Sequence, residues 1–111
     1  MRYIVTEGWQ ASYADPIRLR PGDPVVLSGR RDLWEGHVWL WARAPDGREG
    51  WVPDDLIQNS RALRAYAATE LTCAPGVRLV GGTADHGWIW CRDAAGAEGW
   101  VPARCLSVVA G

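Results

Sequence analysis

Residues 36–53, GHVWLWARAPDGREGWVP, predict a β-hairpin that decides the fold. The Pro-Asp-Gly sequence at 45–47 favours a three-residue loop, because Pro fixes the first turn angle and Gly accepts the left-handed conformation that closes it. Side chains alternate between the two faces of a strand, so one face is apolar and the other is rich in Trp. The predicted pairs on the Trp-rich face are Trp39 with Pro53, Trp41 with Trp51 and Arg43 with Glu49.

A second copy of this stretch lies at residues 87–102, GWIWCRDAAGAEGWVP, at a constant offset of 49 residues. Its predicted pairs are Trp88 with Pro102, Trp90 with Trp100 and Arg92 with Glu98. Two copies of one hairpin indicate an internal repeat. We expect one domain at residues 1–57, a short linker at 58–60 and a second domain at 61–109. Many short strands separated by turns predict an all-β chain that forms a small barrel or sandwich.

Composition narrows the class of protein. The chain has 111 residues, a net charge of −1, eight Trp, no Phe and no Lys. A net charge so close to zero argues against a dedicated nucleic-acid binder, which normally shows a basic stripe. No apolar run approaches the roughly 20 residues that span a bilayer, and the N-terminus lacks a signal-peptide core. We therefore expect a cytoplasmic protein without membrane attachment. The bias toward Arg, Ala and Gly suggests a bacterial source with a GC-rich genome.

The order of short motifs resembles the Src-homology-3 domain in both repeats. The second repeat carries ALRAY at 62–66, Glu70-Leu71, Pro75-Gly76, Gly87-Trp88 and GWVP at 99–102. The first repeat carries YADPI at 13–17, PGD at 21–23, Trp39 and GWVP at 50–53. This resemblance implies two tandem five-stranded Src-homology-3-like barrels, each with a one-turn helix before its last strand. It also implies a non-enzymatic module that binds proline-rich peptides in a shallow aromatic groove.

The resemblance places candidate ligand-binding residues on matching positions of both repeats. The groove Trp falls on Trp39 and Trp88, and the groove Pro falls on Pro53 and Pro102. Tyr66 matches a groove Tyr in the second repeat, and Tyr13 is its counterpart in the first. The first repeat carries five extra residues before its hairpin, and we expect them to form a polar loop in which Trp34 adds an aromatic wall.

The Trp-rich faces support more than one function. Our leading prediction is recognition of a peptide segment of a partner protein, by a monomer or weak dimer. An alternative is a small-molecule sensor whose Trp cage holds an organic cation through cation–π attraction. A third possible function is that of a structural accessory subunit, because Trp opposite Trp is a strong cross-strand pair that also serves packing. The cross-strand Trp pairs themselves favour the structural interpretation.

Neither catalysis nor a bound cofactor is expected from the remaining side chains. The three Cys have no zinc-ligand spacing, and each replaces an apolar residue of the first repeat, so Cys73, Cys91 and Cys105 are expected to be buried. His37 and His86 have no evident catalytic partner. Asp54 and Asp55 are adjacent acids, and a helix cap explains them more simply than a metal site.

Overall fold

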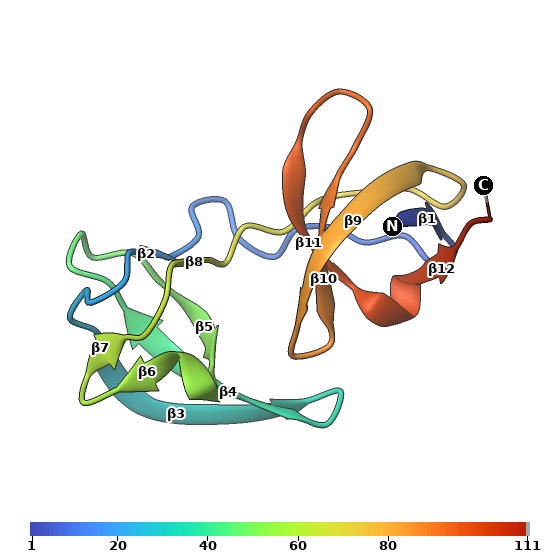
Figure 1. Ribbon diagram of the computed structural model, residues 1–111. Coiled ribbons are helices and arrows are strands. Elements are labelled where there is room, and N and C mark those ends of the chain that lie inside the picture. Colours follow the sequence, from blue (N-terminus) through green and yellow to red (C-terminus); the bar gives the residue numbers. More distant parts are fainter. Residues whose placement is uncertain (111) are drawn as a thin grey trace. The chain divides into compact units, whose positions relative to one another are not determined.

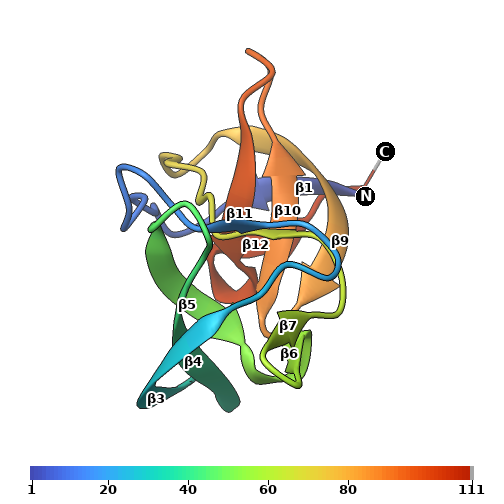
Figure 2. The same ribbon diagram turned by 90° about the vertical axis from the view of Figure 1, so that its left-hand side faces the viewer.

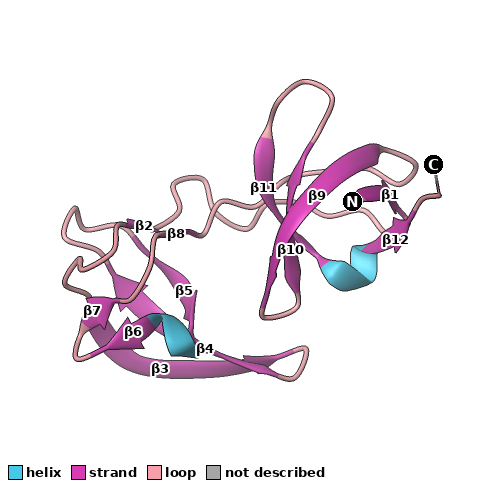
Figure 3. Ribbon diagram, viewed as in Figure 1, coloured by secondary structure: helices cyan, strands magenta, loops and turns pink. Residues whose placement is uncertain are grey.

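The computed structural model describes residues 1–110, which form an all-β chain with two single-turn 3-10 helices (Figure 3). The strands are β1 (Arg2–Val5), β2 (Arg18–Leu19), β3 (Val26–Trp34), β4 (His37–Arg43), β5 (Glu49–Pro53), β6 (Ile57–Gln58), β7 (Arg61–Ala62), β8 (Tyr66–Ala67), β9 (Arg78–Asp85), β10 (Trp88–Arg92), β11 (Glu98–Pro102) and β12 (Leu106–Val108). The helical turns are η1 (Asp54–Leu56) and η2 (Ala103–Cys105). The all-β class and both one-turn helices are therefore confirmed. None of the helices among residues 1–110 has the length and apolarity needed to cross a membrane.

Both predicted hairpins form with the predicted register. Trp39 pairs with Pro53, and Trp88 pairs with Pro102. The first loop is closed by a hydrogen bond from the Gly47 amide to the Ala44 carbonyl at 3.0 Å, with Gly47 at a φ of +91°. This positive φ explains why glycine occupies the position.

The chain divides into two compact units, but not at the predicted boundaries. The middle unit is Asp15–Ala68, and the terminal unit combines Met1–Ala14 with the chain from Thr69 onward. The first 14 residues thus belong with the second repeat. Residues 58–60, predicted as a linker, instead contribute to β6 and to a tight turn inside the middle unit.

The terminal unit contains one five-stranded sheet in the order β11-β10-β9-β1-β12. The N-terminal strand β1 lies between the two strands of the second repeat, pairing Tyr3 with Leu79 of β9 and with Val108 of β12. In Figure 1 the blue β1 is accordingly seen beside the red β12. Val5 is only 1% exposed and joins a core that includes Leu79, Cys91, Val101 and Cys105. We call this placement of β1 in the sheet of the second repeat the strand exchange.

In the middle unit β7, from the second repeat, occupies the place that β1 leaves open. It pairs with β6 of the first repeat, Ile57 with Ala62 and Gln58 with Arg61 (Figure 2). Asn59 and Ser60 between these strands have φ angles of +53° and +59°. Two consecutive left-handed residues make the tight hairpin turn whose twist suits antiparallel strands. This turn holds β7 beside β6, and β1 is thereby left to pair elsewhere.

The two segments that join the units are each held by antiparallel contacts. In the middle unit, β2 pairs with β8, and the Ala68 amide donates to the Ile17 carbonyl at 3.0 Å. In the terminal unit, Trp9 and Cys73 exchange backbone hydrogen bonds of 2.9 Å. The middle unit is thus an insertion between two paired chain segments.

The sheets are not closed barrels. Residues 1–110 form the five-stranded sheet together with three smaller sheets of the middle unit, β3-β4-β5, β2-β8 and β6-β7. In the middle unit the β6–β7 ladder has two residue pairs, and the register of β3 shifts between Leu27 and Arg31. A register shift of this kind bends the strand locally.

Candidate functional site

The predicted site residues lie on the two hairpins and on the segments around them, and their burial differs. Trp39 is 8% exposed, and Pro53 and Pro102 are each below 2%. Trp88 is half-buried, as are Tyr13, Trp34 and Tyr66. Both proline rings are therefore buried, and Trp88 is more accessible than Trp39.

The strand exchange regroups these residues. Tyr13 belongs to the terminal unit, which also contains Trp88 and Pro102. Tyr66 belongs to the middle unit, which also contains Trp39. Contiguous repeats would have placed Tyr13 with Trp39 and Tyr66 with Trp88. The structure instead places Tyr13 in the unit of Trp88 and Tyr66 in the unit of Trp39.

Trp34 is on a strand and not in the polar loop expected from the sequence. It is the last residue of β3 and pairs with His37 of β4. Glu35 and Gly36 form the turn between them, with φ angles of +50° and +79°. The extra residues of the first repeat therefore lengthen a hairpin, in which two left-handed residues allow β3 to continue directly into β4.

Trp9 is a candidate residue that sequence reasoning missed. Its ring meets that of Trp88 edge to face, with centroids 5.3 Å apart and planes at 86°. The Trp9 indole Nε1 donates to Glu70 Oε1 at 2.9 Å, and the same oxygen accepts from the amide and the hydroxyl of Ser12. Glu70 therefore fixes the loop that carries Trp9 against Trp88. An aromatic residue in a loop was the only signal in the sequence, because the partner Glu70 is 61 residues away.

Arginine side chains lie against Trp rings in both units. In the middle unit the Arg30 guanidinium is 5.2 Å from the Trp41 ring centroid and 5.4 Å from that of Trp51. In the terminal unit the Arg104 guanidinium is 5.9 Å from the ring of Trp9. These distances fall within the range of cation–π attraction. The sequence did not reveal either contact, since each depends on strand placement.

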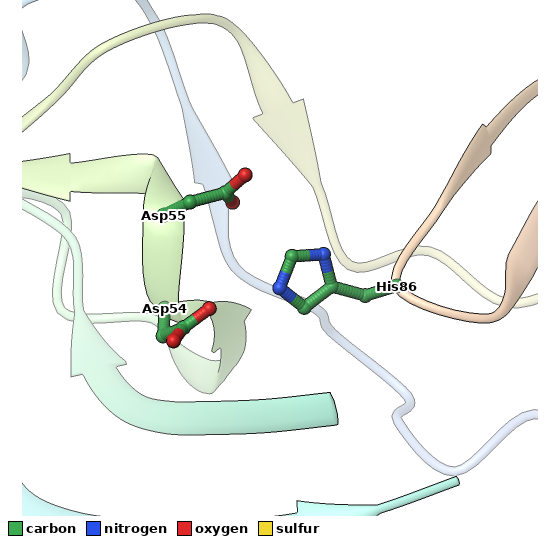
Figure 4. A group of neighbouring side chains, drawn as sticks. All are labelled: Asp54, Asp55 and His86. Carbon is green, nitrogen blue, oxygen red and sulfur yellow. The ribbon is translucent and has the colours of Figure 1, made fainter. Parts of the chain in front are cut away.

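Figure 4 shows Asp54 and Asp55 on η1 together with His86, from the turn before β10. Asp54 and Asp55 stand in the first turn of η1, where no side chain caps the helix, so the predicted cap is wrong. The acids belong to the middle unit and His86 to the terminal unit. Within the terminal unit, His86 Nδ1 lies 2.8 Å from Asp85 Oδ1. Because the two acids and the imidazole belong to separate units, we do not assign a metal site to them.

The cysteines are free thiols, and Cys91 and Cys105 are fully buried as predicted. Cys73 is half-buried and packs against the edge of the same core. Burial raises the pKa of the Cys91 thiol to about 11, and its electrostatic interaction with Cys73 adds to the shift. Burial also raises the pKa of Cys73, although a backbone hydrogen bond with Trp9 opposes the effect.

The raised pKa of Cys91 predicts alkaline destabilisation. Below pH 9.0, the ordinary pKa of a cysteine thiol, Cys91 is neutral in both the folded and the unfolded chain, so its stabilising effect is complete. Between pH 9 and about pH 11 the Cys91 thiol ionises in the unfolded chain but stays neutral in the folded chain. This ionisation lowers the free energy of the unfolded chain and so destabilises the fold. Urea titrations over this range should show the free energy of unfolding of the terminal unit falling by a few kcal/mol. Cys91→Ala should flatten this part of the profile, and an unchanged slope would contradict the assignment.

Comparison with known proteins gives one positive result. The variant SH3 domain family matches residues 2–60, which is more than half of the chain. The chain belongs to this family. SH3 domains are generally non-catalytic modules that bind protein or peptide partners. Searches of curated proteins and of solved structures found no significant match to the chain.

The matched range contrasts with the spatial units of this SH3 protein. It begins with β1, which lies in the terminal unit, and ends in the turn between β6 and β7 of the middle unit. A contiguous SH3 pattern in the sequence is thus distributed over two spatial units. The strand exchange accounts for the difference, because it changes which copy of the first strand each unit uses.

Proposed function

We propose that this protein is a non-enzymatic interaction module made of two SH3-like units, and that it binds a peptide segment of a partner protein. The family supports the general role. The repeated hairpins, with Trp opposite Pro in both, support the view that the terminal unit is SH3-like as well. The proposed location is the cytoplasm of a bacterium, as composition suggested.

The terminal unit is the stronger candidate for the peptide site. Trp88 is half-buried, whereas Trp39 is 8% exposed. Trp9 meets Trp88 edge to face at 5.3 Å, and Glu70 holds Trp9 in place through a 2.9 Å hydrogen bond. A held pair of perpendicular rings offers flat apolar surface to proline rings without demanding buried polar partners. This aromatic pair is the observation that carries the proposal.

The middle unit supplies a second proposed contact around Trp39, Pro53, Trp34 and Tyr66. Trp39 is 8% exposed, whereas Trp88 is half-buried, so a peptide here contacts the half-buried rings of Trp34 and Tyr66 more than the ring of Trp39. We therefore expect weaker binding at this unit than at the terminal unit.

The test is a titration with a library of proline-rich peptides, followed by backbone amide and indole NMR shifts. We expect shifts centred on Trp9 and Trp88, and we expect Trp88→Ala to weaken binding at least about tenfold, as loss of an aromatic anchor does. Tyr13→Ala should weaken binding at the terminal unit, whereas the matched Tyr66→Ala should leave that unit unaffected. Shifts confined to other surfaces, or a response only to quaternary ammonium compounds, would contradict the proposal.

A further inference from the structure

We propose that the outer edge of β3 in the middle unit is a docking site for an extended segment of a partner protein, which adds to the sheet as a further strand. Strand addition of this kind takes its affinity from main-chain hydrogen bonds and its selectivity from alternate side chains. The site is separate from the aromatic groups around Trp88 and Trp39. It rests on backbone pairing and exposed leucines and does not depend on the peptide site proposed above.

β3 is a long strand at the edge of its sheet. It covers nine residues, Val26–Trp34, and all but the last are exposed. One edge of β3 pairs with β4, and no strand within residues 1–110 pairs with the other edge. An edge of this kind presents a row of backbone groups to which another chain can add.

The terminal unit shows how the corresponding edge is filled. There β9 pairs with β10 on one side and with β1 on the other. β1 faces Arg78–Val80 of β9, and the next amide, that of Gly81, donates to the Met1 carbonyl at 2.8 Å. Leu27 has the position in β3 that Gly81 has in β9, because the two pair with corresponding residues of the repeated hairpin. An extended segment is thus the occupant that the chain itself supplies to such an edge.

In the middle unit β7 begins the same pairing and does not continue it. The Val25 amide donates to the Ser60 carbonyl at 2.8 Å, and at Ser60 and Asn59 the chain turns back into β6. Amides two residues apart point to the same side of an antiparallel strand, so the Leu27 amide faces the side of β3 on which β7 stops. The edge beyond this point is therefore left for another chain.

The side chains beside this edge indicate what the added segment carries. Three residues of β3 face the same side, because they pair with alternate residues of β4: Leu27, Arg31 and Leu33. Leu27 is 41% exposed, Leu33 is 71% exposed, and Arg31 is exposed as well. This face thus presents a basic residue between two apolar ones.

The exposure of Leu27 follows from a small residue in β7. In the terminal unit the Tyr3 ring covers Gly81, since a β-carbon added at Gly81 would overlap that ring. Tyr3 pairs with Leu79, whereas Ser60 accepts the hydrogen bond from the corresponding residue of the middle unit. Serine is too short to cover Leu27, so an apolar side chain of the added segment can do so.

The occupant is a segment of a different protein and not the β3 strand of a second copy. Arg30 is midway between Leu27 and Leu33 in the sequence. Antiparallel pairing of these leucines between two copies would therefore set the two Arg30 residues opposite each other, and like charges in that position are destabilising. A segment with an acidic residue between two apolar residues, at alternate positions, matches Leu33, Arg31 and Leu27 in both charge and polarity.

The experiment is an NMR titration of the full chain with the peptide acetyl-Thr-Val-Thr-Glu-Thr-Val-Thr-amide at millimolar concentration. Its valines and its glutamate share one face of a strand. We expect shifts in the backbone amides of β3, Leu27 above all, and NOEs between the peptide backbone and β3. The control peptide acetyl-Thr-Thr-Val-Glu-Val-Thr-Thr-amide has the same composition but puts valine and glutamate on opposite faces. It should bind at least about threefold more weakly.

Two substitutions separate this edge from general stickiness of the protein. Leu33→Ser should weaken binding at least about threefold, because apolar surface covered by the peptide is lost. Leu63→Ser removes a leucine that is 54% exposed outside the sheet β3-β4-β5 and should leave binding unchanged. Arg31→Glu should reverse the preference between the glutamate peptide and its lysine version, because opposite charges then face each other in the second pair.

The proposal is overturned if the amides of β3 do not respond, if the control peptide acts as well as the first, or if Leu33→Ser and Leu63→Ser behave alike. Shifts of the β3 amides with protein concentration alone would show that a second copy is the occupant, which also contradicts the proposal. Because the probe contains no proline and the signals are those of β3, these outcomes are distinct from failure of the peptide site at Trp9 and Trp88.

Discussion

Gly99→Ala should lower the free energy of unfolding of the terminal unit by about 3 kcal/mol or more, at the upper end of the range for overpacking. A β-carbon at Gly99 would lie 2.6 Å from the carbonyl carbon of Glu70 and 2.7 Å from the amide nitrogen of Leu71. This backbone cannot easily retreat. The Leu71 amide donates to the Trp100 carbonyl at 3.0 Å, and the Trp100 amide donates to the Thr69 carbonyl at 2.9 Å.

The matched control is Gly82→Ala in the same unit, where the nearest atom to the new β-carbon is 3.9 Å away. We expect this variant to change the free energy of unfolding by no more than about 1 kcal/mol, as is usual for exposed strand positions. Urea denaturation followed by Trp fluorescence measures both variants. Equal stabilities for the two would mean that the segment at Glu70 and Leu71 does not pack on β11 as described.

The second large effect is expected from cutting the chain at the boundaries of its spatial units. The fragment of residues 15–68 should fold alone, because it contains β2 to β8 and its ends are paired through Arg18 with Ala67. A fragment of residues 61–111 should remain unfolded, and so should the shorter fragment of residues 69–111. Both lack β1, the central partner of β9 and β12, and with it the side chain of Val5, which is 1% exposed in the intact core.

Addition of a peptide of residues 1–14 should restore folding of a fragment of residues 69–111, since the two together make up the terminal unit. Circular dichroism and NMR dispersion provide the readout. Independent folding of both 1–60 and 61–111, with no gain from the added peptide, would show that the two repeats fold as contiguous domains.

Local features of this fold could be predicted from the sequence. The alternation of Trp with smaller apolar residues around the Pro-Asp-Gly turn specified both the strands and the register of the first hairpin, because strand faces and turn length act over a few residues. The second copy then identified the hairpin of β10 and β11. The one-turn helices followed from the resemblance of the flanking GWVP motifs to SH3 domains.

The pairing of β1 could not be predicted in the same way. It depends on whether residues 58–60 act as a linker or as a turn, and Asn-Ser lacks the glycine that marks most such turns. The positive φ angles of Asn59 and Ser60 show that these residues form a turn. The same choice determines which Tyr shares a unit with Trp88.

The contacts of Trp9 and Arg30 were also beyond sequence reasoning. Trp9 reaches Trp88 only because residues 1–14 are in the terminal unit, so this contact depends on the strand exchange. Arg30 reaches Trp41 because β3 continues through a segment that was expected to be a loop. Both contacts depend on strand placement, which turn chemistry alone does not specify.

The most direct test of the strand exchange is the measurement of interstrand NOEs from β1 in the intact chain. The structure predicts NOEs between the backbone protons of Tyr3 and those of Leu79 and Val108. They should appear within single molecules, so a sample mixing labelled and unlabelled chains should show no such NOEs between chains. NOEs from β1 to Ile57 of β6, the strand with which β7 pairs in this structure, would contradict the exchange.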